Sequence, residues 1–303
     1  MRRLLPVVTA LAAGLARALA IVAVAFFLCR VMPGDVVDVL GLEGGLTDAQ
    51  QAELRAALGL DRPVIAQFVD WGAQALGGDF GRSVRFDRPV AEMLVHAAPV
   101  TLELALGSFG VGIGLAFGLA IAATSLRSRV LDAVIDALNV WSIAVPTFCA
   151  GVVGIIVFSL WLGWLPVIGS LVLPILIIGL DNAGQIVKLV REDLAEAVML
   201  PHVRTARAKG LSPWRIALVH VLPVAAPIAL VLSGLVLSGL VAGTLTMEIL
   251  FGLPGIGSLM LNAVHGRDLP VVLAAVTVVA VALVAINTLV DALHRLIDPR
   301  VTR

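Results

Sequence analysis

Long apolar stretches alternate with polar segments along the whole 303-residue chain. A bilayer core is about 30 Å thick, and a helix needs roughly 20 apolar residues to cross it. Such spans are helical, because no water is present there to hydrogen-bond an exposed backbone. The pattern therefore predicts an all-α polytopic membrane protein with six transmembrane helices, near residues 8–32, 102–124, 134–162, 167–190, 213–244 and 269–296.

The connecting segments differ in the sign of their charge. Acidic residues outnumber basic ones between residues 33 and 98, whereas basic residues dominate both ends of the chain, the turn at 126–130 and the connection at 188–215. Because cytoplasmic loops carry an excess of Lys and Arg, both termini and the 188–215 connection are expected in the cytoplasm. The predicted organisation is a cytoplasmic N-terminus with the first span (1–32), an external, periplasmic insertion (33–98) and a transmembrane core (99–303) with a cytoplasmic loop at 191–212.

The external insertion contains one clear helical pattern. The stretch LTDAQQAELRAALGL predicts a short helix that Thr47 or Asp48 caps and Gly59 ends. Nothing in this stretch points to catalysis, and we interpret it as a solvated surface element.

Composition agrees with a membrane location and narrows the function. Hydrophobic residues make up 60% of the chain, against about 45–50% in soluble domains, and the net charge is zero. The neutral balance indicates no nucleic-acid partner. The two cysteines suggest no disulfide framework, the five histidines show no metal-ligand spacing, and the phosphate-binding pattern GxxxxGK[ST] is absent. We therefore expect a chain that is not an enzyme and holds no metal or other cofactor.

A basic stretch late in the chain, PHVRTARAKGLSPWRIALVHVLP, stands out from its apolar surroundings. Pro201 is suited to open a short helix, and Gly210 fits the left-handed position just beyond its end. Ser212 and Pro213 are then the N-cap and first residue of the next span. A short tethered helix that also carries small residues is suited to dock a partner. The alternative is a plain positively charged anchor that contacts lipid headgroups.

A few polar residues lie inside predicted spans, where ionisable side chains are costly. Asp181 and Asn182, with Gln185 one turn further on, fall in the fourth span. They form either a polar patch that lines an aqueous path or a hydrogen bond between helices. In the fifth span, small residues that include Ser238 and Gly239 allow close approach at a pore seam.

Two other classes of membrane protein stay open on these residues alone. An ion-coupled secondary transporter would work without ATP, although buried ionisable groups are scarce in these spans. An intramembrane enzyme would need a nucleophile and a base in adjacent spans, and no convincing pair is found.

An ordered series of motifs resembles one family along nearly the whole chain. ARAKGLSPWRIALVHVLP looks like the cytoplasmic EAA loop of ABC-importer permease subunits, and RTARAKGL is similar to the dipeptide/oligopeptide/nickel branch. The external insertion after the first span resembles the first, B-type subunit of the two permeases in such systems. Eight further motifs resemble the same branch. In their order along the chain they are PGD, LGLDRP, GDFGRS, TLELAL, LGWLP, FGLPGIGSL, RDLPVV and DPR.

This resemblance implies a fold, a function and partners. It implies the type I ABC-importer permease fold and a transmembrane subunit that imports di- or oligopeptides across the bacterial cytoplasmic (inner) membrane; nickel chelates and glutathione-like compounds are the alternative substrates. The implied partners are a homologous second permease, two ATPase subunits that bind ATP and Mg, an external solute-binding protein and membrane lipid. The residues implied are Arg204, Thr205, Ala206, Arg207, Ala208, Lys209, Gly210 and Leu211 for coupling to the ATPases, and Asp79, Arg82, Arg267 and Asp268 for docking of the binding protein.

Two departures from the family pattern bear on function. Arg204 and Thr205 stand where the general motif has Glu-Ala, as is usual in this branch. Asp181 and Asn182 occupy a place where small or apolar residues are expected. The substrate path is therefore expected to involve Asp181, Asn182 and Gln185, together with Ser238 and Gly239.

Overall fold

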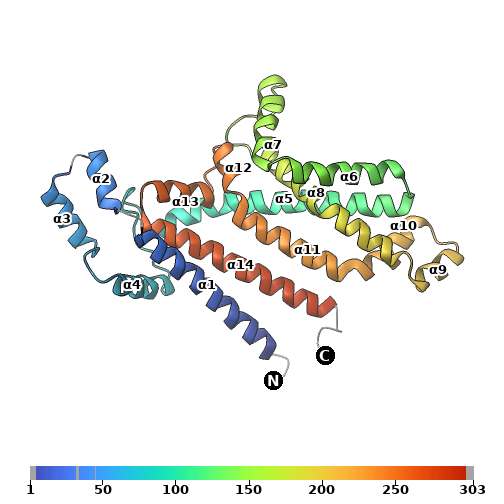
Figure 1. Ribbon diagram of the computed structural model, residues 1–303, viewed down its shortest axis with the longest axis horizontal. Helices are drawn as coiled ribbons and strands as arrows, with labels where there is room; N and C mark the ends of the chain where they lie inside the picture. Colours follow the sequence, from blue (N-terminus) through green and yellow to red (C-terminus); the bar gives the residue numbers. More distant parts are fainter. Residues whose placement is uncertain (1–4, 32–33, 45, 298–303) are drawn as a thin grey trace. The chain divides into compact units, whose positions relative to one another are not determined.

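The computed structural model describes residues 5–31, 34–44 and 46–297 (Figure 1). This described part is helical, and its one β-type contact is an isolated bridge between Arg82 and Pro89. Two compact units make up the chain: Met1–Thr101 with Pro254–Ala285, and Leu102–Leu253 with Ile286–Arg303. The boundary between them falls inside two long helices.

The first unit holds the whole insertion that was expected outside the membrane, and it has a small apolar core. The core forms where Val90, Leu94 and Ala97 pack against Ile256 and Ala274. The backbone N–H of Ile256 also donates to Thr101 Oγ1 at 2.8 Å. The unit comprises α1 (Leu5–Val31), α2 (Val36–Gly44), α3 (Asp48–Ala57), α4 (Val64–Leu76), the start of α5 (Val90–Leu126), α13 (Ile256–His265) and most of α14 (Leu269–Ile297).

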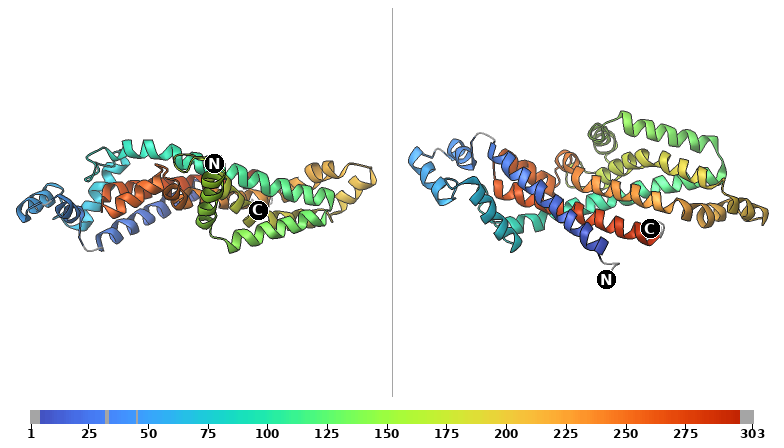
Figure 2. Two further views of the ribbon diagram at one scale, coloured as in Figure 1. Left: turned by 90° about the horizontal axis from the view of Figure 1, so that it is seen from above. Right: turned by 60° about the horizontal axis from the view of Figure 1, so that its bottom comes forward.

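The second unit is built around α8 (Val172–Ala197), which has buried residues along most of its length. The views in Figure 2 show α6 running alongside it. Besides the rest of α5 and the end of α14, the unit holds α6 (Arg129–Ala144), α7 (Thr147–Gly154), a π-helix (Ile155–Trp161), α9 (Pro201–Ala208), α10 (Pro213–Ile216), a second π-helix (Ala217–Val221), α11 (Leu222–Gly243) and α12 (Leu245–Leu250).

Five described helices are long and apolar enough to cross a membrane, and a bent pair supplies a sixth span if its two parts count as one. The pair is α6 with α7 and the following π-helix, bent by 101°. Pro146 lacks a backbone N–H and disfavours helical geometry at Val145, which is extended at φ −108° and ψ 112°. The span predicted near 134–162 is therefore broken into two helical parts at Pro146.

Helices α6 and α8 approach each other closely at Gly184. A Cβ added to Gly184 would lie 2.5 Å from the carbonyl oxygen of Leu138, so only glycine fits there. Asn139 Nδ2 donates to the carbonyl oxygen of Gly184 at 2.9 Å. This contact fixes the register of the two helices.

Two ion pairs join α6 and α8 near the predicted end of the fourth span. Lys188 pairs with Asp136 at 3.3 Å, and Arg191 pairs with Asp132 at 3.1 Å. The first charges after the apolar run therefore lie on α8, which continues to Ala197. The cytoplasmic loop expected at 191–212 therefore begins inside this helix.

The segment that follows α1 begins with a clasp between α2 and α3. Asp35 Oδ1 accepts from the backbone N–H groups of Val37 and Asp38, and its Oδ2 accepts from Arg55 Nε at 2.9 Å. Burial acts to raise the pKa of Asp35, but the bonds from Arg55 and from the α2 backbone outweigh it and hold that pKa below its usual range. Helix α3 confirms the capping prediction: Thr47 forms a capping box with Gln50.

Candidate functional site: the basic α9 segment

The basic stretch folds as the sequence predicts. Pro201 is the first residue of α9, and Gly210 has the left-handed φ of +75°. The N–H of Gly210 bonds to Arg207 O at 2.9 Å and that of Leu211 to Ala206 O at 3.4 Å, which is the Schellman pattern of a helix end. Ser212 then caps α10 by accepting from the backbone N–H of Arg215. Two helices thus meet at a tight, fully bonded turn.

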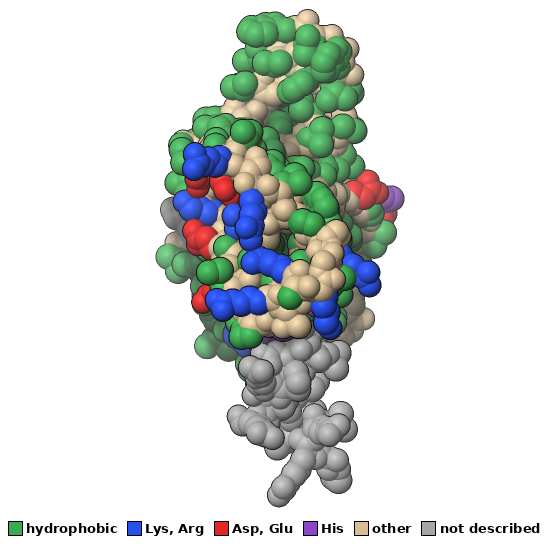
Figure 3. Space-filling model, turned by 90° about the vertical axis from the view of Figure 1, so that its right-hand side faces the viewer, with side chains coloured by type: hydrophobic (Ala, Val, Ile, Leu, Met, Phe, Trp, Pro, Cys, Tyr) green, Lys and Arg blue, Asp and Glu red, His purple; other side chains and the backbone are tan. Residues whose placement is uncertain are grey.

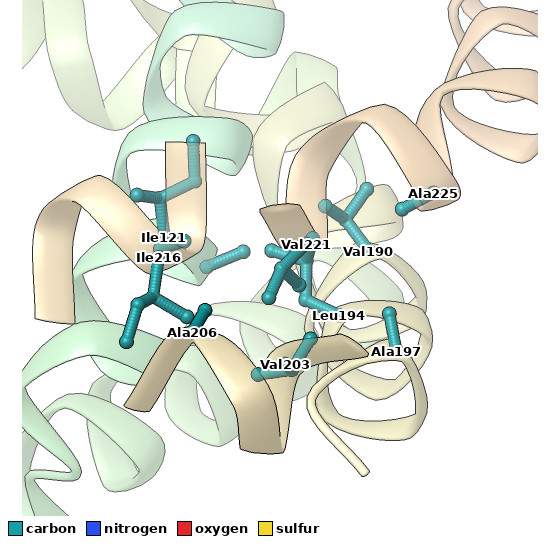
Figure 4. Packing of buried hydrophobic residues seen from close by; sticks show 11 residues of the cluster. Ile121, Val190, Leu194, Ala197, Val203, Ala206, Ile216, Val221 and Ala225 are labelled. Atoms are coloured by element: carbon teal, nitrogen blue, oxygen red, sulfur yellow. The ribbon is translucent and has the colours of Figure 1, made fainter. Parts of the chain in front are cut away.

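Helix α9 is held by apolar side chains on one face. Val203 is completely buried and Ala206 is 3% exposed, and the two lie one turn apart. They belong to one cluster with Leu194 of α8 and with Ile216 and Val221 at the start of the fifth span (Figure 4). A single core therefore joins α9 to two different spans.

A polar bond adds to this apolar contact. His202 Nε2–H donates to the carbonyl oxygen of His220 at 3.1 Å, and His220 lies in the π-helix that continues α10. In a π-helix the backbone bonds run from i to i+5, so some carbonyls are available to side chains. His202 therefore ties the first turn of α9 to the beginning of the fifth span.

The opposite face of α9 is basic and exposed. Arg204, Arg207, Lys209 and Arg215 are all exposed, and no ion pair involves them among the residues that the structure describes. Figure 3 shows Lys and Arg side chains gathered at this end of the second unit. Unpaired cations on a surface favour an acidic partner or an anionic lipid surface.

The expected coupling residues divide into two groups. Thr205 and Ala208 are exposed with the basic side chains, so they are available to a partner. Ala206 was expected on the docking face, but it is buried against the chain's own core, and Leu211 is half-buried against the same cluster. Ala206 and Leu211 therefore hold α9 against the chain's own core.

The basic segment lies within the part of the chain that matches a known family. Residues 112–303 match the binding-protein-dependent transport system inner membrane component family. The chain belongs to this family. The match includes α8, α9 and the spans that follow, and this permease family accounts for an apolar chain that exposes a basic helix between two spans.

Individual relatives agree with this assignment over nearly their whole length. A protein of Brucella abortus, provisionally named a peptide transport system permease, is 32% identical over 91% of this chain and 92% of its own. The di/tripeptide transport system permease DppB of Pseudomonas aeruginosa is 31% identical over 91% and 92%. The glutathione transport system permease GsiC of Salmonella choleraesuis is 36% identical over 95% and 96%. This chain is a multi-pass permease subunit of an ABC importer.

The polar patch of the permease's fourth span lies on α8, as predicted. Asp181 is 6% exposed, and its Oδ2 accepts from Thr147 Oγ1 of α7 at 2.7 Å and from Gln185 Nε2 at 3.2 Å. Asn182 is half-buried, and its Nδ2 donates to Ile178 O. Asp181 thus makes the helix-to-helix hydrogen bond that the sequence left as one alternative, while Gln185 is exposed.

The two small residues predicted in the fifth span have different surroundings. Ser238 Oγ donates to Asn287 Oδ1 of α14 at 3.4 Å. Gly239 is exposed, and a Cβ added to it would meet nothing within 4 Å. Gly234, one turn earlier, is the position that packs closely, against Val290. The close helix contact in this region is therefore internal to the chain.

The four residues expected to dock a binding protein lie in the first unit. Asp79 accepts from the N–H of Gly81 at 2.8 Å, and Arg82 pairs with exposed Asp87 at 3.0 Å. Asp268 is completely buried, and its Oδ2 accepts from Ser83 Oγ at 2.5 Å. The expectation of a docking contact was therefore wrong for Asp268, because its carboxylate holds the segment after Arg82 in place.

One buried acid was missed by the sequence analysis. Glu248 of α12 is completely buried, and its Oε1 accepts from Thr244 Oγ1 at 3.0 Å. The signal was available, since Glu248 is an acidic residue within the otherwise apolar stretch LTMEILFGL.

Among the described residues no group of three or more His, Cys, Asp or Glu side chains is arranged to hold a metal ion.

Proposed function

We propose that this permease imports di- or oligopeptides as one of two homologous membrane subunits of an ATP-driven importer. The support comes from relatives that carry peptide-transport names and align over at least 91% of this chain. In this proposal the chain lies in the bacterial inner membrane among its lipids, with both termini in the cytoplasm and residues 33–98 outside. The chain needs no nucleic acid and no cofactor of its own.

The anchoring of α9 is the observation that carries the mechanism. Two cytoplasmic ATPase subunits bind ATP and Mg, and one of them docks on the exposed basic face that includes Arg204, Arg207 and Lys209. Because Val203 and Ala206 are buried in the cluster shared with α8 and the fifth span, a push on α9 is passed to both spans. The movement alternates access to the path between the two sides of the membrane.

An external solute-binding protein delivers the peptide to the outer face of the first unit. Asp79 and Arg82 lie on one exposed loop, and Arg267 lies on the α13–α14 turn with a left-handed φ of 52°. Buried Asp268 fixes both segments by accepting from Ser83 Oγ. In this proposal Asp79, Arg82 and Arg267 make the contacts, and Asp268 positions them.

The substrate path is proposed to run past exposed polar and small positions of the second unit. Gln185 and Gly239 are exposed, and Asn182 is half-buried. Asp181 contacts the path through Gln185, to which it is hydrogen-bonded. A large side chain at Gly239 is then expected to obstruct uptake, because it would protrude where no neighbour now lies. Full uptake by Gly239→Phe would count against this placement.

A glutathione-like compound is the second candidate substrate. It is favoured by the 36% identity to the glutathione transport system permease over 95% of this chain. Nickel chelates are a further alternative for the same scaffold, and an ion-coupled secondary transporter is the alternative mechanism.

The first experiment is to co-express the tagged chain with its genomic neighbours and to purify it in detergent. We expect a second permease subunit and two ATPase subunits to purify with it. Proteoliposomes that contain this complex and the binding protein should take up labelled dipeptide only with ATP and Mg inside. Uptake by the isolated chain without ATP would refute the proposal, and glutathione uptake that exceeds peptide uptake would select the second candidate.

A further inference from the structure

A cavity of about 520 Å³ lies within the first unit. It is lined by the last residues of α1, by α4 and by the first turn of α14, including Arg30, Trp71 and Leu269. The apolar span of α1 ends at Val31 and that of α14 begins at Leu269. Because both spans end there, the cavity opens at the level where a bilayer meets water.

Two hydrogen-bond donors of the cavity lining are buried without a partner. Arg30 Nε and Trp71 Nε1 are shielded from solvent, and neither has an acceptor among the described residues. A buried donor that lacks an acceptor costs roughly 1–3 kcal/mol, so native proteins rarely keep two in one place. This pair of donors calls for a ligand that brings acceptor oxygens into the cavity.

Arg30 also forms no ion pair with any residue that the structure describes. Its guanidinium donates to the neutral amide oxygen of Gln67 and lies 5.6 Å above the ring of Phe26. By contrast, Arg62 pairs with Asp70 at 2.6 Å. None of the ion pairs seen in the described residues includes Arg30, so an anion is the ligand that would match it.

Basic residues outnumber acidic ones in the cavity lining. The lining contains three arginines and two aspartates. One of the aspartates, Asp35, is already paired with Arg55, which lies outside the cavity. The cavity is therefore net positive.

Helix α4 presents its polar side to this cavity and its apolar side outward. Gln67, Trp71 and Gln74 line the cavity. Ile65 and Leu76 lie on the opposite side of the helix and are 70% and 93% exposed. Helix α4 lies near the end of α1 (Figure 1). A helix that exposes an apolar stripe beside the ends of two spans is suited to lie in the headgroup region of a bilayer.

We propose that this cavity binds the phosphate group of an anionic phospholipid from the adjacent leaflet. Arg30 Nε and Trp71 Nε1 donate to the phosphate oxygens, and the acyl chains extend beside the apolar stripe of α4. Arginine and tryptophan at a membrane interface suit this role, since a phosphate group is a strong acceptor of charge-assisted hydrogen bonds. The bound lipid would hold α4 against the end of α1.

The test uses the whole purified importer complex with phosphatidylglycerol as the probe. Native mass spectrometry counts the lipid retained, and thermal shift compares phosphatidylglycerol with inorganic phosphate and with diacylglycerol, which lacks the phosphate. We expect stabilisation by phosphatidylglycerol alone. Trp71→Phe, which keeps an aromatic side chain and removes the N–H donor, and Arg30→Gln should each weaken retention about tenfold, as expected for a lost hydrogen bond to a charged group.

Matched controls change the same residue types away from the cavity. Trp161→Phe alters an exposed tryptophan, and Arg88→Gln alters an exposed external arginine that pairs with Glu92; both should retain lipid as the wild type does. Wild-type retention in Trp71→Phe and Arg30→Gln would overturn the proposal. Equal stabilisation by inorganic phosphate would show that the cavity binds free phosphate and would overturn the assignment of a lipid. Loss of activation by the binding protein with lipid retention intact would assign the cavity to protein docking instead.

Discussion

Substitutions of Gly210 test the proposed coupling between α9 and ATP hydrolysis. At this position they change the backbone preference without creating a steric clash. Its φ of +75° lies in the left-handed region, and a Cβ added there would meet no atom within 4 Å. Any effect of a substitution must therefore come from the preference of the new residue for that φ. The residue closes the Schellman turn that joins α9 to α10, so the effect is expected at α9, the helix proposed to couple to the ATPases.

The free-energy cost of replacing Gly210 can be estimated from its left-handed φ. An L-residue in the left-handed conformation loses roughly 1–2 kcal/mol, Asn loses less, and β-branched Val loses more. A change of 1–2 kcal/mol shifts the population of the native turn by a factor of about 5–30. Gly210→Asn, Gly210→Ala and Gly210→Val should therefore show increasing loss, although Asn and Val occupy similar space.

The assay is the ratio of peptide taken up to ATP hydrolysed in proteoliposomes. We expect this ratio to fall in the order Gly, Asn, Ala, Val, while the amount of assembled complex stays constant. Full uptake by Gly210→Val would refute the argument. Equal losses in Gly210→Asn and Gly210→Val would also refute it, because side-chain volume would then matter and φ would not.

Three further predictions follow from particular contacts. Gly184→Ala places a Cβ 2.5 Å from an α6 carbonyl oxygen and should destabilise the protein by about 1–3 kcal/mol in thermal unfolding, whereas Gly118→Ala, which meets nothing within 4 Å, should leave stability unchanged. The lowered pKa of Asp35 means that its contribution to the α2–α3 clasp is present above the unfolded-state pKa of about 3.9 and is lost as the pH falls through the lower folded-state value. The hydrogen-exchange protection factors of α2–α3 should therefore fall at low pH in the wild type, and Asp35→Asn should remove that dependence. If Asp181 serves mainly as a helix contact, Thr147→Val and Asp181→Asn should lower thermal stability without changing substrate selectivity, and a selectivity change in Asp181→Asn alone would instead assign it to the substrate path.

Local signals explain which elements the sequence could predict. The ends of α9 depend on Pro201, Gly210 and Ser212, each of which acts within a few residues of its own position. The capping box at Thr47 is of the same kind. Such features need no knowledge of the rest of the fold, and they were predicted correctly.

Contacts between distant segments explain the errors. The fourth span was expected to end near residue 190, but α8 continues to Ala197, and Asp132 of α6 pairs with Arg191 just beyond that point. Asp268 was expected at the surface, but Ser83, at 185 residues' separation, covers its carboxylate. Neither partner is visible from the local pattern, since pairing depends on where the helices pack.

The bend in the third span has a different origin. Hydropathy stays high across Val145 and Pro146, so a window average treats both sides of the break as one span. Pro146 was the available signal, because the residue before a proline is driven out of the helical region. Proline alone does not decide the matter, because α5 continues through Pro99 and α11 continues through Pro227.

The position of α9 explains why buried and exposed coupling residues alternate along it. A helix that only touched lipid would need its charges and no buried anchor. Here Val203 and Ala206 enter a core shared with α8, and His202 bonds to the beginning of the fifth span, so α9 is tied to two spans by different kinds of contact. Because close-packed cores transmit displacement with little compression, a force on the basic face must move both spans or break these contacts. Rigidity in the anchor, together with chemistry on the exposed face, is what a coupling helix requires.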